Sequence, residues 1–195
     1  MGINLIKDIN LEVIIMERKK LIKKINKLMY GEFFAAVSFV IAFNIYHKKF
    51  EFDFYLVDYL SITVLVLFLL EGSYFWFCIR NKYIKREKDY GLICLAFRDI
   101  KNLNIMLWLI PFFMNIFMQY HRPMNYLIFN WVVLAFAALE YINYFYVQLY
   151  YPPMEWFIRL RSLDFKESKL HLLMRKNKNT FNTYRIKDKI DIRNN

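Results

Sequence analysis

The sequence has few of the residues that interrupt helices, because only 4 Gly and 4 Pro occur among its 195 residues. This scarcity excludes a collagen-like chain, and a hydrophobic fraction of 58% excludes a disordered one. Such a composition favours long, uninterrupted helices that form one unit. We therefore predict an all-α protein.

Cysteine and histidine are also scarce, with 2 and 3 residues, and no group of them has the spacing of a metal-ligand set. Cys78 and Cys94 are expected to be free thiols in a reducing compartment. His47 and His121 each stand beside a basic residue and are interpreted as loop residues, with metal binding or sensing of external pH as the alternative. His171 is expected on the surface of the tail. We predict no metal site and no cofactor.

The chain lacks the common enzyme motifs. It contains no HExxH, GxSxG or GxxxxGK[ST] motif and no Gly-rich dinucleotide fingerprint. Glu140 and Asn143 have the spacing of a pair that could hold Mg²⁺ for phosphoryl transfer to a lipid, and this stays an alternative. Residues 1–29 interleave charged and apolar positions, so we predict no signal peptide. We expect no catalytic residues.

Long apolar segments dominate the sequence. The clearest covers residues 126–151, contains a single charged residue, Glu140, and is long enough to cross a hydrocarbon core of about 30 Å as one helix. Three further segments cover about residues 30–46, 56–79 and 103–119, the last with Pro111 as an expected kink. Residues 91–97, GLICLAF, are expected to rest on the membrane surface. We predict an integral membrane four-helix bundle over residues 30–151.

Basic residues set the predicted orientation. The chain has a net charge of +11, and 25 of its 28 Lys and Arg residues fall in residues 1–29, between the second and third spans, and in residues 152–195. The positive-inside rule then places both termini in the cytoplasm, in the cell (inner) membrane of a multi-pass protein. Nucleic acid is not needed to explain the charge, and we predict none as a partner.

Two interfacial helices are expected to flank the bundle. Residues 19–29 carry apolar side chains on one side and lysines on the other, which predicts a helix lying in the headgroup layer. A docking helix for a partner or for anionic lipid is the alternative. The basic tail, residues 152–195, is expected to begin with a second interfacial helix, MEWFIRLRSL, and to end flexibly. The predicted membrane-surface lysines are Lys19, Lys20, Lys23, Lys24 and Lys27.

Carboxylates inside the spans are the strongest functional signal, because an ionised carboxylate in a bilayer is costly and usually turns inward. Glu71 and Glu140 lie at comparable depth in antiparallel spans, so we expect them to share one polar core, with Glu32 near its inner mouth. Polar residues at helical spacing from them complete the predicted core or transport site: Glu32, Glu71, Tyr74, Asn104, Asn115, Glu140, Asn143, Tyr144 and Gln148.

These features favour a non-enzymatic membrane subunit that assembles through this polar core, as a homo-oligomer or with a larger membrane protein. A proton- or ion-linked small permease or oligomeric channel using the same carboxylates is the alternative, and a magnesium-dependent lipid-modifying enzyme is another. The aromatic content of 20% is attributed mainly to membrane-interface belts. A cation-binding cage is the alternative explanation, with candidate residues Tyr74, Trp108, Trp131, Tyr141 and Tyr144.

Overall fold

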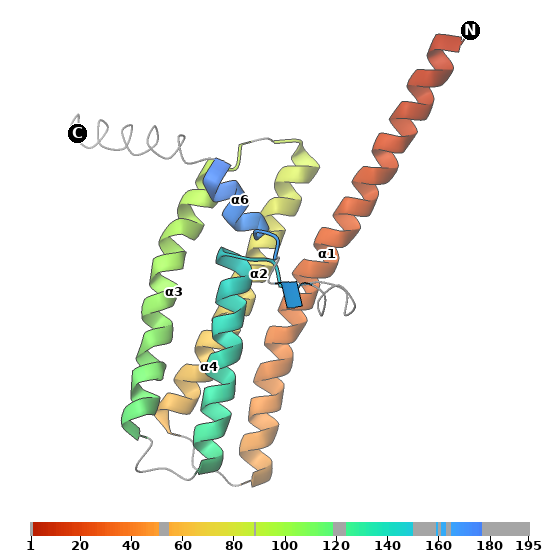
Figure 1. Cartoon of the computed structure of the whole chain (residues 1–195). Helices are drawn as coiled ribbons and strands as arrows, with labels where there is room; N and C mark the ends of the chain where they lie inside the picture. Colours follow the sequence, from red (N-terminus) through yellow and green to blue (C-terminus); the bar gives the residue numbers. More distant parts are fainter. Residues whose placement is uncertain are drawn as a thin grey trace, which may run out of the picture.

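The computed structural model describes residues 2–50, 55–87, 89–118, 124–149, 159, 161–162 and 165–176, with side chains in the first range described for residues 16–48. Its helices are α1 (Gly2–Phe50), α2 (Leu56–Lys85), α3 (Gly91–Met118), α4 (Met124–Phe145) and α6 (Lys169–Lys176) (Figure 1). Among the described residues the only extended pairing is an isolated bridge between Val147 and Glu167. The predicted all-α class is confirmed for this part of the chain.

Four of these helices, α1 to α4, are long and apolar enough to cross a membrane. Even α4, the shortest of them at 22 residues, would be about 33 Å long. The four predicted spans are therefore present, and the chain has the architecture of a multi-pass membrane protein. The side on which the termini lie stays a prediction.

The first helix differs from the prediction. Residues 19–29 do not form a separate helix on the membrane surface, because α1 runs unbroken through all 49 residues from Gly2 to Phe50. Its apolar face is buried at Ile25 and Met29, which are 4% and 8% exposed, and Ile25 packs with Phe75 and Ile79 of α2. Since α2 is longer than a membrane span requires, this face of α1 packs against α2 and not against lipid. The N-terminal part of α1 projects beyond the other helices (Figure 1).

The helix α3 also begins earlier than predicted. Residues 91–97, expected to rest on the membrane surface, form its first turns, where Cys94 and Phe97 are buried. Neither Cys78 nor Cys94 forms a disulfide. The helix continues through Pro111, which is itself buried.

The helix α4 ends at Phe145, before the predicted end at residue 151. Its last turn is held by groups from elsewhere in the chain. The Ser168 hydroxyl donates to the carbonyl oxygen of Tyr144 at 2.5 Å. The Nδ1 atom of His171 lies 3.1 Å from the carbonyl oxygen of Phe145. The Asn143 side-chain oxygen accepts from the backbone N–H of Leu149 at 2.8 Å. These bonds satisfy C-terminal carbonyls that a helix leaves without partners, so the chain can turn here. Residues 150 and 151 lie outside the described part.

We call the end of the bundle where α2 ends and α3 begins the basic end. Arg18 ties α1 to α2 there, because its guanidinium donates to the carbonyl oxygens of Tyr83 and Ile84, both at 3.0 Å. A cation at the C-terminus of a helix also interacts favourably with the helix dipole. Lys82, in the last turn of α2, binds Glu87 just beyond the helix, and this bond lowers the pKa of the Glu87 carboxyl. The predicted tail helix, MEWFIRLRSL, lies almost wholly outside the described residues.

Away from the basic end the bundle is closely packed. Phe43 of α1, Phe68 of α2 and Val133 of α4 belong to one buried apolar cluster. The backbones of α1 and α4 stay more than 8 Å apart throughout their described parts. Aromatic rings bridge this distance, for example Tyr46 and Phe129 with ring centroids 5.5 Å apart. The bridging rings lie in the half opposite the basic end, and this leaves room between α1 and α4 at the basic end.

Candidate functional site: a cavity beside the intramembrane carboxylates

The structure divides the predicted polar core into separate contacts. Asn104 of α3 donates from its side-chain amide to Glu71 of α2, with Nδ2 and Oε2 2.5 Å apart, and Asn104 is 1% exposed. Glu140 of α4 is bonded instead to Asn143 on its own helix, at 3.4 Å. Glu71 and Glu140 therefore do not share a hydrogen-bond partner. The common depth of the two residues in a bilayer stays a prediction.

Tyr144 of α4 lies among all three intramembrane glutamates, which we call the carboxylate cluster: Glu32, Glu71 and Glu140. Its hydroxyl interacts most strongly with Glu32, then with Glu140 and least with Glu71. Glu32 in turn interacts with Glu140. None of the three glutamates has a Lys or Arg within 4.0 Å among the described residues. The cluster is thus an acidic group without a bonded counter-ion.

The Tyr144 ring is set into the surface of α2 at Gly72. A Cβ atom added to Gly72 would lie 1.9 Å from the Tyr144 hydroxyl oxygen and 2.0 Å from its ring carbon Cζ, so only glycine fits there. Tyr144 is 8% exposed, and its hydroxyl interacts with the Glu32 carboxyl.

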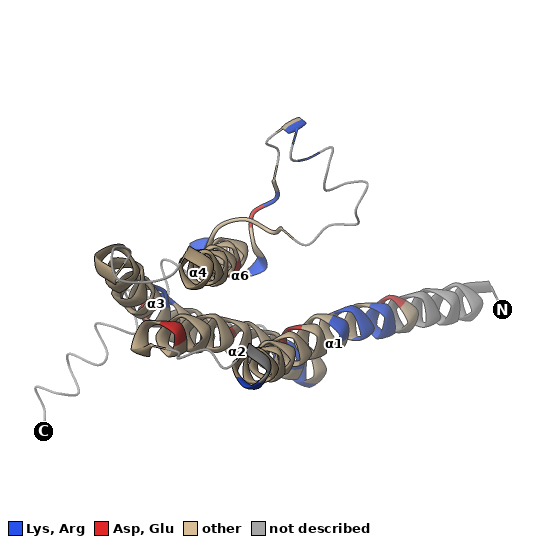
Figure 2. Cartoon of the chain, turned by 90° about the horizontal axis from the view of Figure 1, so that it is seen from below, with Lys and Arg blue, Asp and Glu red and all other residues tan. Residues whose placement is uncertain are grey.

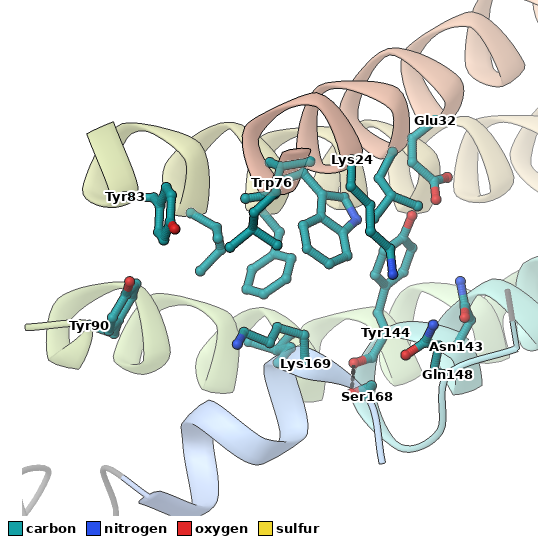
Figure 3. Close-up of a pocket in the computed structure, with 16 residues that line it drawn as sticks. Lys24, Glu32, Trp76, Tyr83, Tyr90, Asn143, Tyr144, Gln148, Ser168 and Lys169 are labelled. Carbon is teal, nitrogen blue, oxygen red and sulfur yellow. Dashed lines mark hydrogen bonds between the residues drawn. The ribbon is translucent and has the colours of Figure 1, made fainter. Parts of the chain in front are cut away.

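A cavity of about 350 Å³ lies at the basic end, between α1, α2, the end of α4 and the start of α6 (Figure 3). Its volume is in the range of small-molecule sites, roughly 300–1,000 Å³. Polar groups reach it from Glu32, Asn143, Tyr144, Gln148 and Ser168, and two exposed lysines, Lys24 and Lys169, belong to its lining. The remaining lining is apolar or aromatic: Leu21, Ile25, Leu28, Phe75, Trp76, Ile79, Tyr83, Tyr90 and Leu170.

The Tyr144 ring separates this cavity from a much smaller void. That void, about 10 Å³, is lined by Glu71, Gly72 and Asn104 among others, and Tyr144 lines both spaces. The Glu71–Asn104 pair is therefore kept apart from the cavity by one side chain.

Several predicted site residues lie elsewhere. Tyr74 is 59% exposed and stacks on Phe77 and Phe97, away from the carboxylate cluster. Asn115 is fully buried near the other end of α3, and its side-chain amide has no hydrogen-bond partner among the described residues. Gln148 is not on α4, which ends before it, but it lines the cavity. Of the predicted surface lysines only Lys24 lines the cavity, and the exposed others are Lys19, Lys20, Lys23 and Lys27.

Sequence reasoning missed a second buried polar pair. Asp58 of α2 and Asn130 of α4 are both 0% exposed, and the Asn130 amide donates to the Asp58 carboxylate with Nδ2 and Oδ1 2.5 Å apart. The other carboxylate oxygen accepts from the backbone N–H of Tyr55 at 2.8 Å, so Asp58 also caps α2. The signal was available, because both residues are polar interruptions within predicted spans.

Asn143 donates to Glu140, so the two residues proposed for Mg²⁺ are bonded to each other. Among the described residues no three His, Cys, Asp or Glu side chains gather into a group that could hold a metal ion. No protein-family model, curated protein sequence or solved structure matches the chain.

Proposed function

We propose that the protein is a non-enzymatic subunit of a larger membrane assembly, in which the four spans form an anchor and α1 presents a basic arm to a partner. The observation that carries this proposal is the unbroken α1, which projects past the other helices at the basic end (Figure 1). At 49 residues α1 would be about 73 Å long, more than twice the thickness of a hydrocarbon core. We call residues 2–27 the arm.

The polar interior supports an internal role for most of the buried polar residues. The Glu71–Asn104 bond joins α2 to α3, and the Asp58–Asn130 bond joins α2 to α4. Interhelical bonds of this kind contribute roughly 0.6–2 kcal/mol each in a membrane. In this proposal the polar core centred on Glu71 and Glu140 keeps the subunit folded, and the arm supplies the assembly surface.

Exposed lysines indicate the chemistry of the partner. Lys19, Lys20 and Lys23 are exposed on the arm, and basic residues gather where α1 leaves the bundle (Figure 2). A surface of one charge sign favours partners of the opposite sign. The proposed partner is therefore a membrane protein with an acidic surface beside the bilayer, either a larger protein or a second copy of this chain that offers its own acidic residues.

Reversing the charge of the arm tests this function. The triple variant Lys19→Glu, Lys20→Glu and Lys23→Glu keeps good helix formers, and we expect it to reduce the mass of the assembly in mild detergent to that of the chain alone, as measured by native electrophoresis and mass photometry. The control, Lys85→Glu, Lys166→Glu and Lys176→Glu, makes the same charge change elsewhere and should leave the assembly intact. A wild-type chain that runs alone, or equal dissociation of both variants, would contradict the proposal.

A second candidate, a proton- or ion-linked permease, is favoured by the one-sided access to the carboxylate cluster. The cavity reaches Glu32 from the basic end, while the opposite half of the bundle is filled by the apolar cluster around Phe43 and Phe68. For this candidate we expect proteoliposomes to show proton flux under a potassium diffusion potential, reported by an internal pH dye, and Glu32→Gln or Glu140→Gln to abolish it. The subunit proposal expects no flux from the wild-type chain.

A further inference from the structure

The polar end of the cavity holds one carboxyl group, that of Glu32, and no described Lys or Arg lies within 4.0 Å of it. Glu32 lines the cavity and interacts with Glu140 and with the Tyr144 hydroxyl. Two carboxylates near each other at the edge of a bilayer repel, and a cation placed between or beside them relieves that repulsion. The position beside Glu32 therefore favours a positively charged group.

Tyr144 is the second polar group at this end of the cavity. It is 8% exposed and lines the cavity, and its hydroxyl interacts with the Glu32 carboxyl. Figure 3 shows this hydroxyl pointing toward Glu32. An N–H donor placed beside the two can bond both the carboxyl oxygen and the hydroxyl oxygen. Asn143 and Gln148 bring neutral side-chain oxygens to the same end of the cavity.

The walls fit an apolar body attached to such a cation. Phe75 and Trp76 line the cavity beside Tyr144, and aliphatic side chains of α1 and α2 complete the walls. Aromatic faces attract organic cations by about 0.5–2 kcal/mol, most strongly where water is excluded. The cavity is therefore suited to a ligand with a charged end and an aromatic or aliphatic end.

We propose that this cavity binds a small lipophilic organic ammonium ion, a primary amine on an aromatic or aliphatic body, with its ammonium group between Glu32 and Tyr144. The body lies along Phe75 and Trp76. The three lysines proposed for assembly, Lys19, Lys20 and Lys23, do not line this cavity, so the two proposals succeed or fail separately.

The lysines in the lining make the charge assignment testable. Lys24 and Lys169 are exposed and would attract an anionic amphiphile and repel a cation. If the ligand is an ammonium ion, removing the charge of Lys24 strengthens binding. If it is an anion, the same change weakens binding.

Four probes that share one ring and a short chain separate these cases: 2-phenylethylammonium, its N,N,N-trimethyl analogue, 2-phenylethanol and 3-phenylpropanoate. The full chain is placed in phosphatidylcholine nanodiscs, and binding is measured by calorimetry with empty nanodiscs as the reference. We expect saturable binding of 2-phenylethylammonium, binding of the alcohol weaker by about tenfold or more, and none of the carboxylate. The trimethyl analogue should bind more weakly than the primary amine because it has no N–H to donate.

Variants assign the contacts. Glu32→Gln should weaken binding of 2-phenylethylammonium by about tenfold, and Tyr144→Phe, which keeps the ring, by about threefold to tenfold. Lys24→Gln should strengthen it by about threefold. Glu17→Gln and Lys27→Gln are matched controls on α1, exposed and outside the lining, and should leave the affinity within about twofold.

Three results would overturn the proposal: binding of 3-phenylpropanoate as tight as that of the amine, unchanged affinity in a folded Glu32→Gln variant, or weaker amine binding in Lys24→Gln. If Glu32→Gln does not fold, the four probes on the wild-type chain still decide the sign of the ligand's charge.

Discussion

The Asp58→Ala variant is expected to be the least stable single substitution in the bundle. Asp58 is fully buried and accepts two hydrogen bonds, from the Asn130 side chain and from the backbone N–H of Tyr55. Removing the carboxylate leaves both donors without an acceptor, and each such loss costs about 1–3 kcal/mol. We expect a total destabilisation of about 2–5 kcal/mol, measured as a shift in the unfolding transition in mixed micelles.

Asp99→Ala serves as the control for this loss. The Asp99 side chain is 74% exposed and, among the described residues, bonds only the neighbouring Arg98, so its removal should change the free energy of unfolding by less than about 0.5 kcal/mol. The double variant Asp58→Ala, Asn130→Leu should recover part of the stability, because removing both partners of a buried bond costs less than removing one. Equal stability of the Asp58 and Asp99 variants would show that the buried pair is unimportant.

Gly72→Ala is expected to have the second-largest effect, because the added methyl group would overlap the Tyr144 ring. The ring cannot move away easily, since Tyr144 is buried and its own carbonyl oxygen is held by Ser168. Overpacking of this kind costs about 1–3 kcal/mol. Thermal unfolding followed by tryptophan fluorescence should show a lower midpoint.

Gly31→Ala is the matched control, because a Cβ atom at Gly31 meets nothing within 4 Å. Alanine has the higher helix propensity, so this variant should gain up to about 1 kcal/mol. Introducing Gly72→Ala into a Tyr144→Ala background should then cost nothing, since the atoms that it overlaps are gone. If Gly72→Ala is as mild as Gly31→Ala, Tyr144 does not occupy the position described above.

Hydropathy predicted which segments cross the membrane, but it did not predict where the helices end. A transfer scale measures the preference for hydrocarbon, and this preference stops at the headgroups. The helices α1, α2 and α3 continue past that boundary because residues such as Ile25 and Cys94 pack against neighbouring helices there. The early end of α4 depends on Ser168 and His171, which lie more than twenty residues further along the chain.

Polar residues of the candidate site were predictable, but their pairing was not. Counting residues from the helix ends placed Glu71 and Glu140 at one level, yet the rotation of each helix about its axis decides which neighbour a side chain meets. Tyr74 follows Glu71 by three residues, about 60° around the helix, and yet its side chain is 59% exposed and stacks on Phe77 and Phe97. Asp58 was overlooked because an acidic residue at a helix start resembles an ordinary cap until its burial is known.

The continuity of α1 makes the arm a lever. Glu32, which lines the cavity, and Lys19, which faces the surroundings, belong to one rod with no loop between them. A force that tilts the arm therefore displaces the part of α1 that lines the cavity. A molecule bound in the cavity would in turn move the N-terminal end of the arm. A change at the cavity can in this way move the tip of the arm without any hinge.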